Sequence, residues 1–359
     1  MLLLLAFACG PDDPPSDATV EQPWNPDHET TAVVATVARD YTVGALATVD
    51  LDTMQIREEL ATISGDARLA FDDGTLVVLN GYGVDTVRLY EPGVWSAPRT
   101  EIGMSDGSPT NPHDAAICDD KLFVLLYETD AIAVLDPESG AEIGSVPLGA
   151  YADDDGLPEP WNLVEIDGAL YVALNRLDRD DAWSDRGGLV VEVSCDEEKV
   201  VRTWSTAGNP MVHRWDDDAR ILVSTRAYAG DPGGLSILDT RDGSYTQLVG
   251  QDVLGGTADE ATAFGTHAIV AALATDYEKT AIQCVDLETG DVDTIDTTVD
   301  FVTAVVGNDR GEAWIGTDWG WTDPAAAQPR LRVFDVATCA EWTGEPLRLD
   351  LAPYSLTFY

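Results

Sequence analysis

An all-β fold, a seven-bladed β-propeller, is predicted by three features of this 359-residue sequence. From residue 31 onward, short β-branched runs alternate with Asp- and Gly-rich turns roughly every 8–12 residues. A unit of four such runs repeats with a period of about 47 residues, which is the size of a propeller blade. The last residues of the chain supply a strand that the first unit lacks. We therefore expect residues 31–359 to form one closed domain.

The repeat is clearest in residues 113–149, where four strand-length runs read HDAAICDD, KLFVLLYE, AIAVLDPESG and AEIGSVPLG. The same order of runs begins again near five other positions: Asp66, Trp161, Pro210, Ala258 and Val299. In most units the third run ends on an acidic residue before a turn: Asp50, Glu91, Asp136, Asp239, Asp286 and Asp335.

The two ends of the chain complete each other. The unit that begins at Thr31 has three runs, and nothing before it matches a first strand. Residues 353–359, PYSLTFY, alternate in polarity as a first strand does, but no unit follows them. Joining the ends gives seven blades and leaves no sheet edge exposed in the ring.

Residues 122–149 resemble the YVTN-type β-propeller repeat of bacterial and archaeal surface proteins. That repeat has an aromatic-Val-x-Asn strand, a short loop, a Val-Ile-Asp strand and a Val-Pro-Val-Gly strand. Residues 170–175, LYVALN, match its first strand, and Cys284-Val285-Asp286 match its second loosely. The resemblance implies a propeller over residues 31–359. It leaves the activity open, because related propellers include binding proteins, lactonases and quinoprotein dehydrogenases.

The first ten residues, MLLLLAFACG, resemble a bacterial lipoprotein signal, in which an apolar run ends at a small residue before a cysteine. We expect residues 1–8 to be a signal segment and Cys9 to carry the lipid. Residues 9–30 are rich in Pro, Asp, Glu and Thr, so they are expected to form a flexible linker. This predicts an exported protein anchored to the outer membrane, in the periplasm or at the cell surface.

The charge balance excludes one class of partner. The chain has 20 Lys and Arg against 65 Asp and Glu, a net charge of −45 at pH 7. Such a field repels nucleic acid and does not bind anionic lipid through a basic patch. The expected partners are a membrane, through lipid at Cys9, and an unknown protein or small-molecule ligand. We expect the chain to be monomeric.

The candidate site is the mouth of the central channel, which the first strand of each blade lines. Aligning the units places these residues there: Asp66, His113, Asp114, Trp161, Asn162, Met211, Asp259, Glu260, Asp300 and Tyr354. Carboxylate, amide and carbonyl oxygens that face one axis suit Ca²⁺, which takes about 6–8 oxygen ligands. Calcium is therefore a candidate cofactor, and a water-filled polar channel is the alternative.

Two functions fit these features. The first is an exported, lipid-anchored propeller that binds a ligand or protein through the loop-rich face of its channel. The alternative is a divalent-metal-dependent hydrolase or lyase of the lactonase type, with His113 as acid or base. A quinoprotein-like oxidoreductase fits less well, because the sequence has no C-x-x-C-H haem motif and no recurrent Trp-docking blade signature. G-x-S-x-G and P-loop motifs are also absent from the sequence.

Four cysteines follow Cys9, and they allow three pairings: Cys118, Cys195, Cys284 and Cys339. Cys118 aligns with apolar positions of other units, which predicts burial. Cys195 and Cys339 occupy equivalent turns three blades apart, too far to bridge. We therefore expect mostly free, buried thiols.

Overall fold

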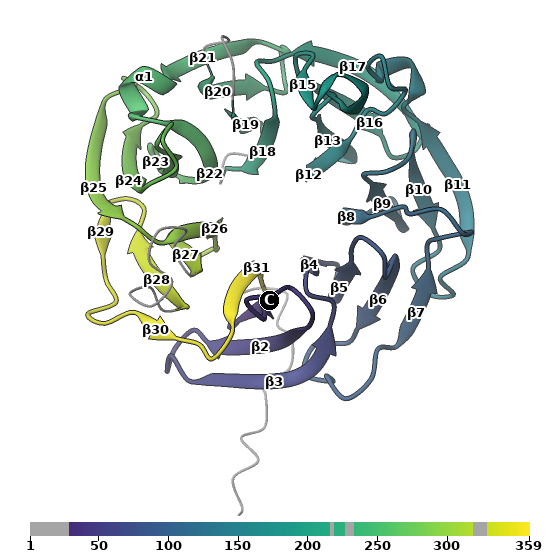
Figure 1. The fold of residues 1–359 in the computed structure, drawn as a ribbon, viewed down its shortest axis with the longest axis horizontal. Helices are drawn as coiled ribbons and strands as arrows, with labels where there is room; N and C mark the ends of the chain where they lie inside the picture. Colours follow the sequence, from purple (N-terminus) through teal and green to yellow (C-terminus); the bar gives the residue numbers. More distant parts are fainter. Residues whose placement is uncertain (1–28, 216–218, 227–232, 319–328) are drawn as a thin grey trace, which may run out of the picture.

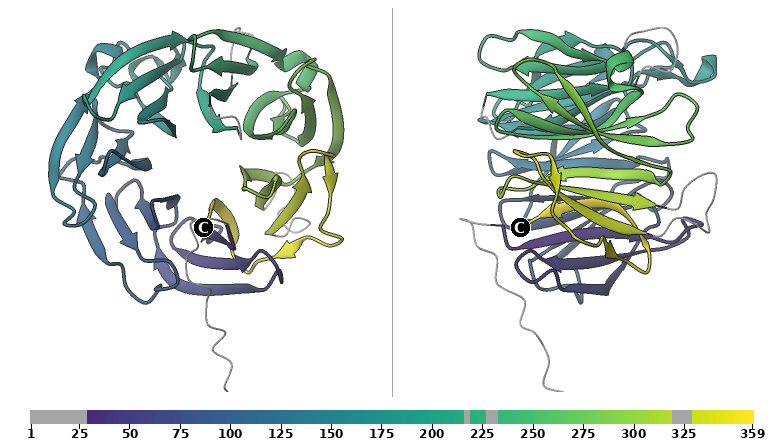
Figure 2. Two further views of the ribbon diagram at one scale, coloured as in Figure 1. Left: turned by 180° about the vertical axis from the view of Figure 1, so that it is seen from behind. Right: turned by 90° about the vertical axis from the view of Figure 1, so that its left-hand side faces the viewer.

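A computed structural model describes residues 29–215, 219–226, 233–318 and 329–359, so Cys9 and the predicted signal segment lie outside the described residues. Seven antiparallel sheets stand in a ring around a central axis (Figure 1). Edge-on, the ring is a thick disc (Figure 2). The predicted seven-bladed β-propeller is confirmed.

Blades 2 to 4 each run outward from an inner strand. Blade 2 consists of β4 (Arg68–Asp72), β5 (Thr75–Asn80), β6 (Thr86–Tyr90) and β7 (Thr100–Gly103). Blade 3 consists of β8 (Pro112–Cys118), β9 (Lys121–Leu126), β10 (Ala131–Leu135) and β11 (Glu142–Pro147). Blade 4 consists of β12 (Pro160–Ile166), β13 (Ala169–Leu174), β16 (Leu189–Ser194) and β17 (Lys199–Ser205). Its β13–β16 loop carries a small ribbon of β14 (Leu177–Asp178) and β15 (Ser184–Asp185).

Blades 5 to 7 repeat this order. Blade 5 consists of β18 (Pro210–Arg214), β19 (Arg220–Thr225), β20 (Gly234–Asp239) and β21 (Tyr245–Gly250), followed by the short helix α1 (Gln251–Leu254). Blade 6 consists of β22 (Thr257–Phe264), β23 (His267–Leu273), β24 (Thr280–Asp286) and β25 (Val292–Thr298). Blade 7 has β26 (Phe301–Gly307), β27 (Glu312–Asp318) and β28 (Arg330–Asp335), and an outer strand split into β29 (Ala340–Glu341) and β30 (Leu347–Arg348).

Blade 1 is built from both ends of the chain. The C-terminal strand β31 (Ala352–Phe358) is its inner strand and pairs with β1 (Thr31–Val37), which precedes β2 (Gly44–Asp50) and β3 (Ile56–Ile63). The register aligns Val34 with Leu356. The carbonyl oxygen of Tyr359 accepts the backbone N–H groups of Thr30 and Thr31 at 2.7 and 2.8 Å. The predicted closure of the ring is confirmed.

The core lies between blades, because each sheet is covered on both faces by its neighbours. Strands β5, β9 and β13 are therefore almost continuous apolar runs. Between blades 3 and 4, for example, Phe123 packs with Leu170 and Val172. The antiparallel order places two sets of loops on one face: those that enter the inner strands, and those between the second and third strands. We call this the loop face.

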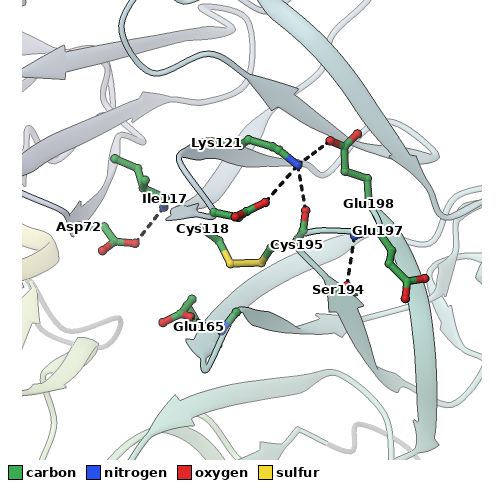
Figure 3. The surroundings of a disulfide bond; sticks show 11 residues. Asp72, Ile117, Cys118, Lys121, Glu165, Ser194, Cys195, Glu197 and Glu198 are labelled. Carbon is green, nitrogen blue, oxygen red and sulfur yellow. Dashed lines mark hydrogen bonds and ion pairs between the residues drawn. A yellow bond between two sulfur atoms is a disulfide. The ribbon is translucent and has the colours of Figure 1, made fainter.

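The expectation of mostly free thiols is wrong. Cys118 bonds to Cys195, and Cys284 bonds to Cys339. Each disulfide joins neighbouring blades, 3 to 4 and 6 to 7. Figure 3 shows the first one beneath Lys121, whose ammonium donates to the carbonyl oxygen of Cys195 at 3.1 Å. Cys118 and Cys195 are both buried, as predicted for Cys118.

Candidate functional site

A cavity of about 640 Å³ lies in the channel and is lined by all seven inner strands. Seven of the ten residues predicted at the channel mouth line it: His113, Asp114, Trp161, Asn162, Met211, Glu260 and Tyr354. The other three do not. Asp66 accepts a hydrogen bond from the Ser64 hydroxyl at 2.8 Å. Asp259 and Asp300 form ion pairs with Arg226 and Arg330.

Two of the lining residues tie blades together. The Asp114 carboxylate accepts the backbone N–H groups of Ala115 at 2.8 Å and of Leu163, in the next blade, at 2.9 Å. Asn162 both donates to the carbonyl oxygen of Val212 (2.7 Å) and accepts its N–H (3.1 Å). Asn162 is thereby committed to the backbone of blade 5. Burial, the largest influence, raises the pKa of Asp114 to about 6.

His113 belongs to an aromatic cluster at the mouth. Its ring centroid lies 4.3 Å from that of Trp161 and 5.0 Å from that of Tyr127. Nδ1 lies 2.9 Å from the carbonyl oxygen of Trp161, which can only accept, so Nδ1 carries the proton. Burial, followed by the charge of Arg68, holds the pKa of His113 well below its usual value. His113 is therefore neutral at pH 7 and packs against rings.

Arg68 is the main residue that sequence reasoning missed. Its guanidinium lies 4.7 Å from the ring centroid of Trp161 and 5.8 Å from that of Tyr354. Within the described part of the chain, no carboxylate lies within ion-pair distance of Arg68. Arg226 also lies over Trp161, at 5.4 Å, but Asp259 neutralises it. The available clue was an arginine at an inner-strand position in a chain with few basic residues.

Glu260 faces the same cavity from blade 6. Burial, followed by repulsion from Asp259, raises its pKa to about 8. At pH 7 most of this carboxyl group is protonated and can donate a hydrogen bond. The mouth thus presents a guanidinium and a neutral acid to one space, beside aromatic rings and the Asp114 carboxylate, which two backbone N–H groups hold.

At the end of the cavity opposite the mouth, two acidic residues, Glu29 and Asp309, lie together. Glu29 accepts the N–H of Asp309 at 2.8 Å, and Asp309 accepts the N–H of Glu29 at 3.1 Å. Burial raises the pKa of Glu29 to about 7. Glu29 belongs to the predicted linker, and sequence reasoning did not place it at the channel. These bonds fasten the start of β1 to blade 7.

A histidine–serine pair deeper in the channel is structural. His213 Nε2 lies 2.7 Å from the Ser224 hydroxyl. Ser224 is fully buried, so no substrate reaches its oxygen. Burial lowers the pKa of His213 to about 3, which makes it a poor base near neutral pH.

No group of three or more His, Cys, Asp or Glu side chains in the described ranges is arranged to hold a metal ion. Asp259 and Asp300, two of the predicted calcium ligands, are engaged by arginines. Calcium binding stays a prediction. In the same part of the chain, no helix is long and apolar enough to cross a membrane.

No family model and no curated protein matches the chain. Solved structures do resemble it. A protein from Lactobacillus plantarum has a TM-score of 0.61 and 14% identity over 92% of this chain and 99% of that one. Hydrazine synthase from Kuenenia stuttgartiensis has a TM-score of 0.57 and 12% identity over 88% of this chain and 95% of that one. Dihydro-heme d1 dehydrogenase has a TM-score of 0.52 and 14% identity over 88% of this chain and 66% of that one. At such identities the likeness shows the propeller fold alone.

Proposed function

We propose that this protein is a binding protein that takes a small anionic ligand, with a carboxylate or phosphate group, into its central channel. The observation that carries the proposal is Arg68, which faces the cavity between Trp161 and Tyr354 with no carboxylate at ion-pair distance in the described residues. A planar guanidinium held between rings suits oxyanions, which it binds through two parallel hydrogen bonds.

The surroundings favour an anion over a cation. Asp259 neutralises Arg226, so Arg68 supplies the positive charge of the mouth, and Glu260 is mostly neutral at pH 7. The cavity of about 640 Å³ falls within the roughly 300–1,000 Å³ typical of small-molecule sites. The net charge of −45 opposes anions at long range, but salt screens that field beyond about 10 Å at 0.1 M.

The first test is calorimetric titration with acetate, succinate, citrate and inorganic phosphate. We expect at least one of them to bind, and Arg68→Leu to weaken that binding about 10- to 100-fold, since a hydrogen bond to a charged group contributes about 1.5–3 kcal/mol. Arg88→Leu is the matched control, because Arg88 pairs with Glu101 on the outer strands of blade 2. Equal binding by wild type and Arg68→Leu would contradict the proposal.

The same titration has a predicted pH dependence. Glu260 loses its proton as the pH rises through about 8 and then repels an anion in the cavity. Affinity should therefore fall between pH 7 and pH 9 in the wild-type protein. Glu260→Gln, which stays neutral, should keep its affinity over that range. A variant that loses affinity as steeply as wild type would show that Glu260 does not face the ligand.

We also propose that the protein is exported and anchored through lipid on Cys9. Ala8-Cys9 supports this, and two disulfides are compatible with an oxidising compartment. Cys9→Ser in the native host should move the protein from the membrane fraction to the soluble fraction. Full retention in the membrane fraction would contradict the anchor.

A further inference from the structure

Among the described residues, four exposed aromatic side chains lie on the loop face, and we call them the aromatic rim: Tyr41, Tyr82, Trp183 and Tyr277. They are between 50% and 63% exposed. Each lies in the loop between the second and third strands of its blade, in blades 1, 2, 4 and 6. Valines on two of these loops, Val43 and Val84, are exposed beside them. The rim therefore surrounds the opening of the channel at several points.

Two of these loops have the same sequence pattern and the same conformation. Residues 38–41 read ARDY and residues 274–277 read ATDY. In both, the tyrosine N–H donates to the alanine carbonyl oxygen, at 2.8 Å for Tyr41 and 2.9 Å for Tyr277. In both, the aspartate accepts the backbone N–H two residues later, at 3.2 and 3.1 Å. The chain thus presents an Asp–Tyr pair twice in one geometry.

The backbone at three rim residues is one that folding alone disfavours. Tyr41, Trp183 and Tyr277 have φ angles of 56°, 62° and 59°. In this left-handed region the Cβ atom of an L-residue crowds the following carbonyl group, and glycine fits without that cost. A bulky aromatic residue at such a position is unfavourable for the fold, although the Tyr41 ring gains a contact with the Tyr354 ring at 6.1 Å and the Trp183 ring one with Arg179. Turn residues such as Asp119 and Glu198 share this backbone region, and the aromatic residues that adopt it in the described part of the chain all belong to the rim.

Charge indicates the chemistry of the partner. Exposed carboxylates flank the rim in sequence and outnumber its exposed basic neighbours, Arg39 and Lys279, although Asp181 is paired with Arg186: Asp40, Asp181, Asp276 and Glu278. An aromatic face next to a carboxylate binds an ammonium or guanidinium group. One such contact already exists within the chain, where the Arg179 guanidinium lies 5.0 Å from the Trp183 ring centroid. A net charge of −45 attracts basic partners and repels acidic ones.

We infer that the aromatic rim binds a basic polypeptide, a lysine- or arginine-rich segment of a partner protein. Tyr41 contacts Tyr354, which lines the channel cavity, whereas Tyr82 and Tyr277 do not line it, so this part of the rim is separate from the proposed anion site. The aromatic side chains give the surface its specificity, and the acidic field speeds encounter.

The test is the fluorescence anisotropy of a labelled decalysine peptide in 0.15 M NaCl. The double variant Tyr82→Ser/Tyr277→Gly should bind it about tenfold more weakly, with an unchanged melting temperature, because glycine suits the φ angle at position 277. Trp342→Ser is the control, since Trp342 is 46% exposed on the outer edge of blade 7 and should change binding less than twofold. Anion binding in the channel should be unaffected in both variants.

Two results would overturn the inference. One is equal peptide binding by wild type and the double variant, which would mean diffuse attraction to an acidic surface. The other is an equal loss of peptide affinity in Trp342→Ser, which would mean that exposed aromatic side chains anywhere on the propeller contribute alike. Failure of the channel titrations would leave this comparison unaffected, because the two assays use different probes and different residues.

Discussion

Deletion of residues 354–359 is expected to give aggregated or protease-sensitive protein. The deletion removes most of β31, the inner strand of blade 1, with its buried Leu356 and Phe358, and the buried Tyr359 that follows the strand. Phe358 packs on Trp314 of blade 7, and Tyr359 packs on Phe71 of blade 2. Each such side chain contributes about 2–5 kcal/mol, so their joint loss approaches the roughly 5–15 kcal/mol that holds a domain folded.

The measurement is limited proteolysis with gel filtration, and the matched control removes residues from the other end. Deletion of residues 10–28, the greater part of the predicted linker, should leave an intact and monodisperse domain. A well-folded C-terminal truncation would contradict the closure of the ring by β31.

Loss of both disulfides should have the second-largest effect. The bonds close loops whose ends are separated by 77 and 55 residues. Restricting the unfolded chain in this way contributes about 2–4 kcal/mol per bond. The two bonds lie in different pairs of blades, so their contributions should add. The variant with all four cysteines changed to alanine should therefore unfold with a free energy about 4–8 kcal/mol below wild type.

Chemical denaturation with and without reductant measures the stability that the two disulfides contribute. Reduced wild type should match the four-alanine variant, and each two-alanine variant should lie midway. Stability that is the same in oxidised and reduced wild-type protein would contradict bonded cysteines.

The fold was predictable because its determinants are local and repeated. Apolar second and third strands recur in every unit, and each unit needs neighbours to cover both faces of its sheet. The closure was visible because Leu356 and Phe358 alternate with Ser355 and Thr357, and the structure buries the first pair more deeply than the second.

The disulfides were not predictable from the repeat. Aligning units compares equivalent positions, such as Cys195 and Cys339, whereas each bond joins non-equivalent positions of adjacent blades. Cys118 ends an inner strand, and Cys195 lies in an outer turn of the next blade. Contacts of this kind depend on the angle between neighbouring sheets, which a linear pattern does not contain.

The site was predictable in place but not in chemistry. Seven of the ten predicted residues line the cavity, yet the carboxylate of Asp114 and the amide of Asn162 are bound to the backbone of a neighbouring blade. The raised pKa of Glu260 depends on burial, which the alternating pattern of β22 does not quantify. Arg68 was missed because the alignment favoured the acidic residue two positions earlier, Asp66.

The most direct test of the channel as an anion site is a crystal structure at pH 7 with a saturating concentration of the small anion that binds best in solution. The account predicts oxyanion density in the channel, with oxygen atoms about 2.7–3.2 Å from the guanidinium nitrogens of Arg68. A Ca²⁺ ion at the mouth, or an anion bound only outside the channel, would contradict it.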